Sequence, residues 1–264
     1  MKNWLTALAV CGALGVCTIG VFADQFLVVG QDRINAGSAG AVLYGSGEDL
    51  VLGIQAIDSI SRTPFLTSAA PLYIVSTSAG DTQKVDIDAI DSNWNRVVIR
   101  DTLTGTSANQ IGSVDLLRVN RIKLRRPAVG YVRVSDQSLA HTPNDSTRVL
   151  ATIMPNYSEP LRSVFSVPKD FVAEVNLSFS TAQSQTVTQP RSLGYLGVVG
   201  MRVRNQVDTT WSIPVMTTVT GDGMFVMPYP VTVGPQSDIV VAAGVTPSVV
   251  FDAISTMRVN ERHE

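Results

Sequence analysis

The sequence predicts an all-β protein with two β-sandwich or jelly-roll-like domains, preceded by an apolar N-terminal segment and an extended arm. Charged residues make up only 16% of the chain, against about a quarter in typical soluble domains. Short runs of alternating apolar and polar residues, separated by polar turns, recur along most of its 264 residues. This spacing is typical of antiparallel sheets, and the length suffices for one large or two small domains.

Composition divides the chain into five predicted segments. They are an apolar N-terminal segment (1–23), an extended arm or linker (24–69), a first β domain (70–136), a linker (137–147) and a C-terminal β-sandwich domain (148–264). The arm is predicted from a Gly-rich, irregular run between about residues 32 and 53. The second boundary is predicted from a polar, turn-rich run without strand alternation.

The N-terminal segment has the pattern of an export signal. Lys2 precedes 19 uncharged residues from Leu5 to Ala23, and Val21 and Ala23 suit a signal peptidase. The same length permits a membrane-spanning helix, and the segment is equally suited to be an element buried in an assembly. The sequence leaves these three alternatives open.

The first β domain contains five strand-like runs, at 71–78, 83–90, 95–103, 114–124 and 129–135. In the second run, Val85, Ile87 and Ala89 alternate with Asp86 and Asp88, so the apolar side chains share one face and the carboxylates the other. Residues 91–93 are turn formers, which predicts a β-hairpin there.

Four aspartates lie between residues 81 and 91 and raise the question of a metal or catalytic site. A calcium loop beginning at Asp86 would lack the glycine at its sixth position and the acid at its twelfth. Asp86 and Asp88 would lie about 7 Å apart, a separation found in some glycosidase pairs, but no apolar pocket is indicated around them. We therefore expect the solvated face of a hairpin.

Cysteine and histidine usage leaves few chemical options. Cys11 and Cys17 both lie in the N-terminal segment, and His141 and His263 are the only histidines. The remaining chain has no disulfide framework, no thiol nucleophile and almost no ligands for zinc. We expect no enzyme activity, no cofactor, and no catalytic, cofactor-binding or metal-binding residues.

A cationic run covers residues 118–126 and contains Arg118, Arg121, Lys123, Arg125 and Arg126. Its alternation with apolar residues breaks near Asn120, which predicts a β-bulge. The run has no aromatic residue for base stacking, and the net charge of −2 provides no overall attraction to nucleic acid. A solvated face or a subunit contact is favoured over phosphate binding.

The C-terminal block has the strand spacing of a sandwich. Its strand-like runs lie at 148–154, 171–179, 194–204, 209–219, 224–233, 237–245 and 247–259. Pro214, Pro228 and Pro230 fall inside these runs, which predicts edge or bulged strands. Such edges are available for subunit contacts.

A succession of short motifs resembles one family of proteins. In chain order these are TLTGTSA (102–108), RVNRI (118–122), FSVPKDFVAEV (165–175), VGPQSDIVV (233–241) and FDAISTMRV (251–259). From about residue 71 to residue 259, the chain resembles virion structural proteins of tailed bacteriophages from aquatic and environmental bacteria. The resemblance implies β domains that act by assembly, and it implies no catalytic residue.

The function implied by this resemblance is a non-enzymatic virion component, either a capsid-associated decoration or head-fibre protein or a tail protein. The expected partners are copies of the chain itself in a homotrimer, the major capsid protein or other virion proteins, and a host surface. No direct contact with nucleic acid is expected. The expected location is the virion, with secretion or membrane association through residues 1–23 as the alternative.

Two other classes of function stay open. A secreted bacterial β-sandwich that binds a surface glycan predicts cleavage after Ala23 and an aromatic platform, for which Trp94, Trp211 and Tyr229 are the candidates. A hydrolase would use Asp86 and Asp88 as its acid and base.

Overall fold

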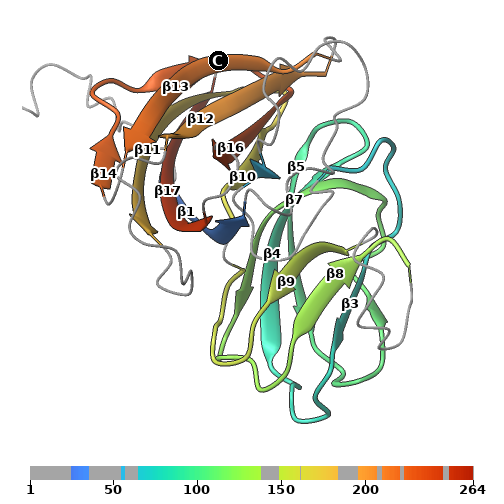
Figure 1. Cartoon of the computed structure of the whole chain (residues 1–264). Helices are drawn as coiled ribbons and strands as arrows, with labels where there is room; N and C mark the ends of the chain where they lie inside the picture. Colours follow the sequence, from blue (N-terminus) through green and yellow to red (C-terminus); the bar gives the residue numbers. More distant parts are fainter. Residues whose placement is uncertain are drawn as a thin grey trace, which may run out of the picture.

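The structure of the chain, a computed structural model, describes residues 25–35, 55–56, 65–137, 149–160, 162–183, 196–206, 210–220, 223–245 and 250–263. Every regular element in these ranges is a β-strand, and the paired strands are antiparallel. They form two β-sandwiches (Figure 1). The all-β prediction is therefore confirmed. The predicted N-terminal segment and His141 lie outside the described residues.

The smaller sandwich, called the inserted sandwich below, has two sheets. One has the order β6 (Asn109–Gln110), β3 (Tyr73–Ser76), β8 (Val132–Ser135) and β9 (Val149–Ile153), and the other has the order β5 (Arg96–Thr102), β4 (Lys84–Asp91) and β7 (Leu116–Leu124). The predicted alternation holds in β4, where Val85, Ile87 and Ala89 are fully buried. They pack with Ile122 and Leu124 of β7 in the core of this sandwich.

Strand β9 departs from the predicted domain boundary at residue 148. It pairs with β8, and Leu150, Ala151 and Ile153 belong to the core of the inserted sandwich. The polar run 137–147 thus lies in the connection between two neighbouring strands of one sheet. A turn-rich composition indicates a loop, but it carries no information about which sheet the next strand joins.

The larger sandwich is a jelly roll made of two five-stranded sheets. The first sheet has the order β1 (Gln25–Asn35), β17 (Val250–His263) and β11 (Phe171–Gln183), with β14 (Gly223–Val226) and β15 (Val231–Val233) pairing with β11. In the second sheet, β10 (Val164–Val167) and β2 (Gln55–Ala56) pair with β16 (Ser237–Val245), followed by β12 (Leu196–Asn205) and β13 (Ser212–Thr220). The chain crosses between the sheets at most connections, as jelly rolls do.

The jelly-roll core lies between these two sheets. Its buried side chains come from both, and they are Phe165, Val167, Ala173, Val175, Leu177, Met201, Met227, Val233, Ile239, Val241, Met257 and Val259. Full burial of a side chain of the size of leucine or methionine stabilises the fold by about 1.5 to 3 kcal/mol. The alternation of these residues along β11 and β16 is the two-residue period that the sequence shows.

Strands β2 and β10 occupy a single strand position. β2 pairs with Ala242 and Ala243 of β16, and β10 pairs with residues 237–240. Between them, the N–H of Val241 donates to the carbonyl of Ser163 at 3.0 Å. One edge strand of the jelly roll is therefore interrupted after Ala56 and resumes at Ser163, with the inserted sandwich filling the interruption.

Strand β1 also differs from the sequence prediction, which assigned residues 24–69 to an extended arm. All 11 residues of β1 pair with β17, from Gln25 opposite Asn260 to Asn35 opposite Val250. The Gly-rich run that predicted a linker starts only near Asp32, at the end of this strand. The predicted arm therefore contains an edge strand of the jelly roll.

The proline prediction is confirmed for the described strands. β13 ends its sheet, and its register against β12 shifts between Met201 and Val203, where Ile213 and Pro214 form a bulge. Pro228 and Pro230 lie in the break between β14 and β15. Because proline has no N–H to donate, bulges and breaks at an edge are where a sheet accepts it.

Candidate functional site

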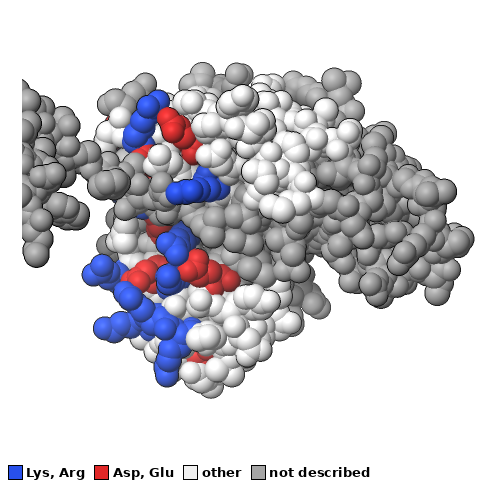
Figure 2. Space-filling view, turned by 90° about the vertical axis from the view of Figure 1, so that its left-hand side faces the viewer, with Lys and Arg blue, Asp and Glu red and all other residues white. Residues whose placement is uncertain are grey.

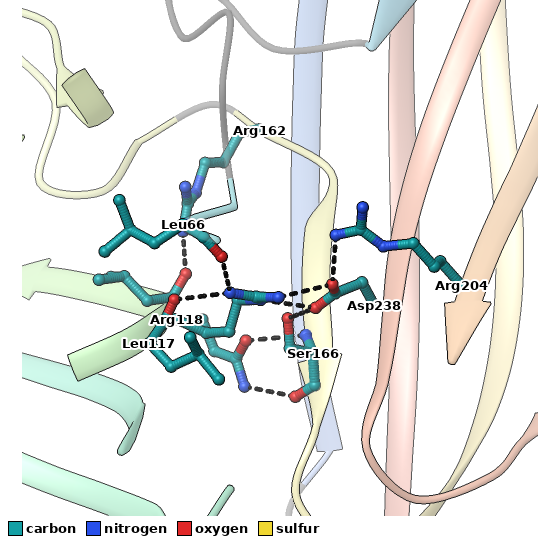
Figure 3. A network of polar contacts seen from close by, with 9 residues as sticks. Leu66, Leu117, Arg118, Arg162, Ser166, Arg204 and Asp238 are labelled. Carbon is teal, nitrogen blue, oxygen red and sulfur yellow. Dashed lines mark hydrogen bonds and ion pairs between the residues drawn. The ribbon is translucent and has the colours of Figure 1, made fainter. Parts of the chain in front are cut away.

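The two sandwiches meet at a polar junction centred on one ion pair (Figure 3). Arg118 of β7 donates from Nε to Oδ1 of Asp238 in β16 at 2.7 Å and from NH2 to Oδ2 at 2.9 Å. The two side chains are only 7% and 3% exposed. Arg118 NH1 also donates to the carbonyls of Leu66 and Leu117. A bidentate pair with further hydrogen bonds is the geometry in which a buried ion pair offsets its desolvation.

Asp238 receives two more hydrogen bonds from the jelly roll. Ser166 Oγ donates to Oδ1 at 2.7 Å, and Arg204 NH2 donates to Oδ2 at 2.9 Å. Figure 3 shows these groups converging on the carboxylate from β10 and β12. One carboxylate therefore binds two guanidinium groups and a hydroxyl, and it links three strands across the junction.

The predicted bulge near Asn120 is present, and it brings the Asn120 side chain into contact with the jelly roll. Asp88 of β4 pairs with Arg121 and Ala89 pairs with Val119, so Asn120 is the extra residue of β7. Its side-chain amide donates to the carbonyl of Ser166 at 2.8 Å and accepts the N–H of Ser166 at 2.8 Å. The bulge therefore turns Asn120 toward β10, where its amide binds the backbone of the jelly roll.

Replacing Asn120 by alanine should lower the free energy of unfolding by about 2 kcal/mol, because the buried N–H and carbonyl of Ser166 lose their partners. Urea denaturation of the purified chain measures this change. The control is Asn93→Ala at an exposed position of the hairpin turn, where we expect less than about 0.5 kcal/mol. Equal effects of the two substitutions would contradict the role of the bulge.

Aromatic rings and guanidinium groups alternate across the junction. The guanidinium of Arg118 lies 5.2 Å from the ring centre of Phe65 and 5.3 Å from that of Trp94. Arg204 lies 4.7 Å from the ring centre of Trp211, and the Phe65 and Trp211 rings are 5.7 Å apart. These cation–π contacts add to the ion pair. They also place two of the three candidate glycan-platform aromatics at the junction, Trp94 buried and Trp211 partly buried.

The hairpin aspartates occupy separate structural positions. Asp88 was expected on a solvated face, but its side chain is only 9% exposed and pairs with Arg96 at 3.0 Å. Arg96 also reaches Glu261 of β17 at 3.4 Å, so this end of β4 packs against the jelly roll. Asp86 remains partly exposed and pairs with Arg125 at 2.7 Å. The strand alternation was read correctly, but it does not reveal that a second sandwich covers part of the outer face.

Asp91 caps the hairpin turn as predicted. It accepts the N–H groups of Asn93 at 2.8 Å and Asn95 at 2.9 Å, and the side-chain amide of Asn95 at 2.9 Å. Partial burial raises its pKa, but these hydrogen bonds outweigh burial and hold the pKa of Asp91 below its ordinary value. Trp94 completes the turn with a φ of 62° and a buried ring.

Asp81 is a buried anchor between loops of the inserted sandwich. It accepts hydrogen bonds from Ser76 Oγ at 2.6 Å, Gln83 Nε2 at 3.2 Å, and the N–H groups of Val129 at 2.8 Å and Gly130 at 2.9 Å. Burial favours a higher pKa, but the four hydrogen bonds together leave the pKa of Asp81 below its ordinary value. The carboxylate of Asp81 therefore has a structural role, because it joins these loops.

The described residues contain no group of three His, Cys, Asp or Glu side chains that could hold a metal ion. In the same parts of the chain, no helix is long and apolar enough to cross a membrane. Asp86 and Asp88, the candidate acid and base, each pair with arginine. The ion pairs and hydrogen bonds of the junction join the inserted sandwich to the jelly roll.

A second feature, called the open edge below, is formed by β13, β14 and the break that follows β14. Its exposed apolar side chains are Ile213, Met216, Met224, Val226 and Tyr229. Met224 is 75% exposed and Tyr229 is 78% exposed. Each sheet has two ends: β1 and β14 in the first sheet, and β10 and β13 in the second. Because β1 contacts β10, the opposite ends, β13 and β14, lie on the same side of the jelly roll.

Sequence reasoning missed the jelly-roll half of the junction. Arg118 was noticed as part of a cationic run, but its partner Asp238 lies 120 residues away. Asp238 stands at the start of a strand, where a polar residue predicts only a turn. No local pattern links the two residues, and the bulge at Asn120 was the one signal of an unusual contact on this strand.

No protein-family model and no curated protein sequence matches the chain. Among solved structures, it is similar to a protein of the empty top-component particles of cowpea mosaic virus, with a TM-score of 0.26, 9% identity, and coverage of 75% of this chain and 87% of that chain. It is also similar to a protein of infectious bursal disease virus strain Gt, with a TM-score of 0.25, 10% identity, and coverage of 91% and 72%. TM-scores this low do not define a common fold, so the function is argued from the chain's own residues.

Proposed function

We propose that the chain is a non-enzymatic structural component of a bacteriophage virion, a capsid-associated decoration or fibre protein that assembles with copies of itself as a homotrimer. The open edge carries this proposal. The sequence from Ser212 to Val233 contains a single charged residue, Asp222. Natural sheets protect exposed edges with charges, lysine above all. An edge that instead exposes methionine, valine and tyrosine suits coverage by another protein surface.

The architecture supports the same proposal. Jelly rolls occur in viral capsid and in lectin domains, and the resemblance of the sequence motifs to phage virion proteins favours the first of these. A glycan-binding module needs an aromatic platform, but Trp94 and Trp211 lie at the junction and contact Arg118 and Arg204. Of the three candidates, Tyr229 alone is strongly exposed.

The proposal assigns different tasks to the parts of the chain. The jelly roll carries the open edge and makes contacts between copies. The inserted sandwich, covering roughly the predicted first β domain together with β9, is held to it by the junction and adds a second surface. Residues 1–23 are assigned to an arm that neighbouring copies or other virion proteins bury.

The open edge is tested by placing charges on it. The double variant Met216→Glu, Val226→Glu should convert the oligomer of the purified chain into monomers, because charges of the same sign would have to be buried at each contact. Sedimentation equilibrium measures the mass of the assembly. The matched control is Val129→Glu, a valine of similar exposure in a loop of the inserted sandwich, and it should leave the oligomer intact.

Two results would contradict this function. One is a wild-type chain that stays monomeric at high concentration, or an oligomer that the charged variant leaves unchanged. The other is a chain that begins at Asp24 and is found free outside expressing cells, which is the product expected of a secreted module. Intact residues 1–23 in purified particles are expected instead.

A further inference from the structure

We infer that the outer face of the sheet β5-β4-β7 binds the phosphate backbone of double-stranded nucleic acid. This face, called the cationic face below, belongs to the inserted sandwich, whereas the open edge belongs to the jelly roll. The inference goes beyond the proposed function and does not depend on it. It also departs from the sequence expectation of no nucleic-acid contact, which rested on the net charge of the chain and on the absence of aromatic residues from the cationic run.

The strand register gathers the cationic side chains. Asp86 of β4 lies opposite Arg100 of β5 on one flank and opposite Lys123 of β7 on the other. Arg96 of β5 pairs with Asp88 and Glu261 at the junction. The cations away from the junction on and beside this face include Lys84, Arg100, Arg121, Lys123 and Arg125. Side chains two residues apart on a strand point to the same side, so these residues share one surface.

Each carboxylate on the cationic face is shared by two cations. Asp86 lies 2.7 Å from Arg125 and 3.7 Å from Arg100. Glu159 lies 3.0 Å from Arg121 and 3.4 Å from Lys123. The next carboxylate along β4, that of Asp88, is held at the junction by Arg96. Five cations against two carboxylates leave an excess of positive charge, although the whole chain has a net charge of −2.

The cations are accessible to a large partner. The side chains of Arg100, Arg125 and Lys123 are 82%, 58% and 50% exposed. Figure 2 shows Lys and Arg side chains gathered around Asp and Glu on the lower part of the molecule, the part formed by the inserted sandwich in Figure 1. Paired surface arginines of this kind keep unused N–H donors, which a phosphate can accept without the pair being broken.

The spacing and chemistry fit a phosphate backbone. Same-side residues along a strand lie about 6.7 Å apart, close to the roughly 6.8 Å that separates every second phosphate of one DNA strand along the helix axis. Arginine binds phosphate with two parallel N–H donors. Arg121, Lys123 and Arg125 stand at every second position along β7 and the residue after it, so they form a row of cations that can follow a row of phosphates.

The three strands of the cationic face offer no ring for base stacking, which favours a nucleic-acid duplex over a single strand. None of β4, β5 and β7 contains an aromatic residue. Single-stranded bases bind mainly by stacking on aromatic rings. A face with cations alone contacts the backbone and does not read the sequence. We therefore expect equal binding to duplexes of unrelated sequence.

The experiment uses the full chain and short fluorescent DNA duplexes of two unrelated sequences, followed by anisotropy. Contacts with about four phosphates predict that the logarithm of the binding constant falls against the logarithm of the salt concentration with a slope of about −3.6. The affinity should therefore fall roughly 100-fold between about 50 and 200 mM salt. Both duplexes should bind equally. Absence of binding at the lower salt concentration would overturn the inference.

Three variants identify the surface. Arg100→Gln with Lys123→Gln should weaken binding and make the salt slope shallower by about two. Asp86→Asn should strengthen binding, because it releases Arg100 and Arg125 from a competing carboxylate. The matched control is Arg262→Gln, an exposed arginine of the jelly roll that also pairs with a carboxylate, Glu174, and it should change nothing.

An unchanged affinity in the Arg100→Gln, Lys123→Gln variant would overturn the assignment of the surface. A second arm uses heparin in place of DNA. If heparin binds through the cationic face but the duplexes do not, the partner is an acidic polysaccharide and the inference is wrong. If the proposed virion function also holds, duplex binding favours a shell component with this face toward packaged nucleic acid over an external fibre.

Discussion

Replacing Asp238 by alanine should lower the free energy of unfolding by about 3 to 5 kcal/mol, because the buried guanidinium of Arg118 loses its counter-charge. The side chain of Arg118 is 7% exposed, so water cannot replace the carboxylate without opening the junction. Ser166 Oγ loses its acceptor as well. Urea denaturation, followed by far-ultraviolet circular dichroism, measures the loss.

The control for this prediction is Arg204→Gln. Arg204 binds the same carboxylate at 2.9 Å but its side chain is 28% exposed, so its removal should cost less than about 1 kcal/mol. The paired replacement Arg118→Met with Asp238→Leu removes both buried charges, and it should restore much of the stability that Asp238→Ala loses. If Asp238→Ala and Arg204→Gln have equal effects, the junction does not depend on the Arg118–Asp238 pair.

Replacing Asp81 by alanine should lower the free energy of unfolding by about 3 kcal/mol, the second largest effect that we expect. Four donors lose their shared acceptor, including the backbone N–H groups of Val129 and Gly130. The same denaturation experiment at neutral pH measures the change. Asp115→Ala, at an exposed aspartate of the same sandwich, serves as the control and should have an effect below about 0.5 kcal/mol.

The effect of Asp81→Ala should also depend on pH. Burial acts to raise the pKa of Asp81, but its hydrogen bonds leave the folded-state pKa below the ordinary value. The unfolded chain therefore takes up the proton first as pH falls, and stability falls with it. The full contribution is present above the unfolded pKa of about 3.9, and it disappears as pH falls through the folded pKa. A difference between wild type and variant that stays constant down to the acid transition would contradict this assignment.

Local patterns predicted the local features of the fold. The alternation of Val85, Ile87 and Ala89 identified the buried face of β4, and the broken alternation at Asn120 identified a bulge. Pro214 identified β13 as an edge strand because proline cannot donate to a neighbouring strand. These signals come from steric and hydrogen-bonding rules that act within a few residues.

The junction and the chain order could not be predicted in this way. Period-two alternation shows which residues share a face, but not what covers that face, so Asp88 was expected to be solvated when it lies beside Arg96 and Glu261. The interruption between β2 and β10 has no composition signal either. Long-range pairing depends on the energy of the complete sheets, which a window of the sequence does not contain.

The interrupted edge strand affects how the protein is made. During synthesis the inserted sandwich emerges with all of its strands close together in the chain, so it can fold while translation continues. β1 emerges earlier, but its partner β17 follows more than 200 residues later, on the order of 10 to 40 s at bacterial elongation rates. Throughout that interval β1 lacks its native partner strand. In the chain, the inserted sandwich separates β1 and β2 from the later strands of the jelly roll, so the jelly roll can close only after the insert has been synthesised.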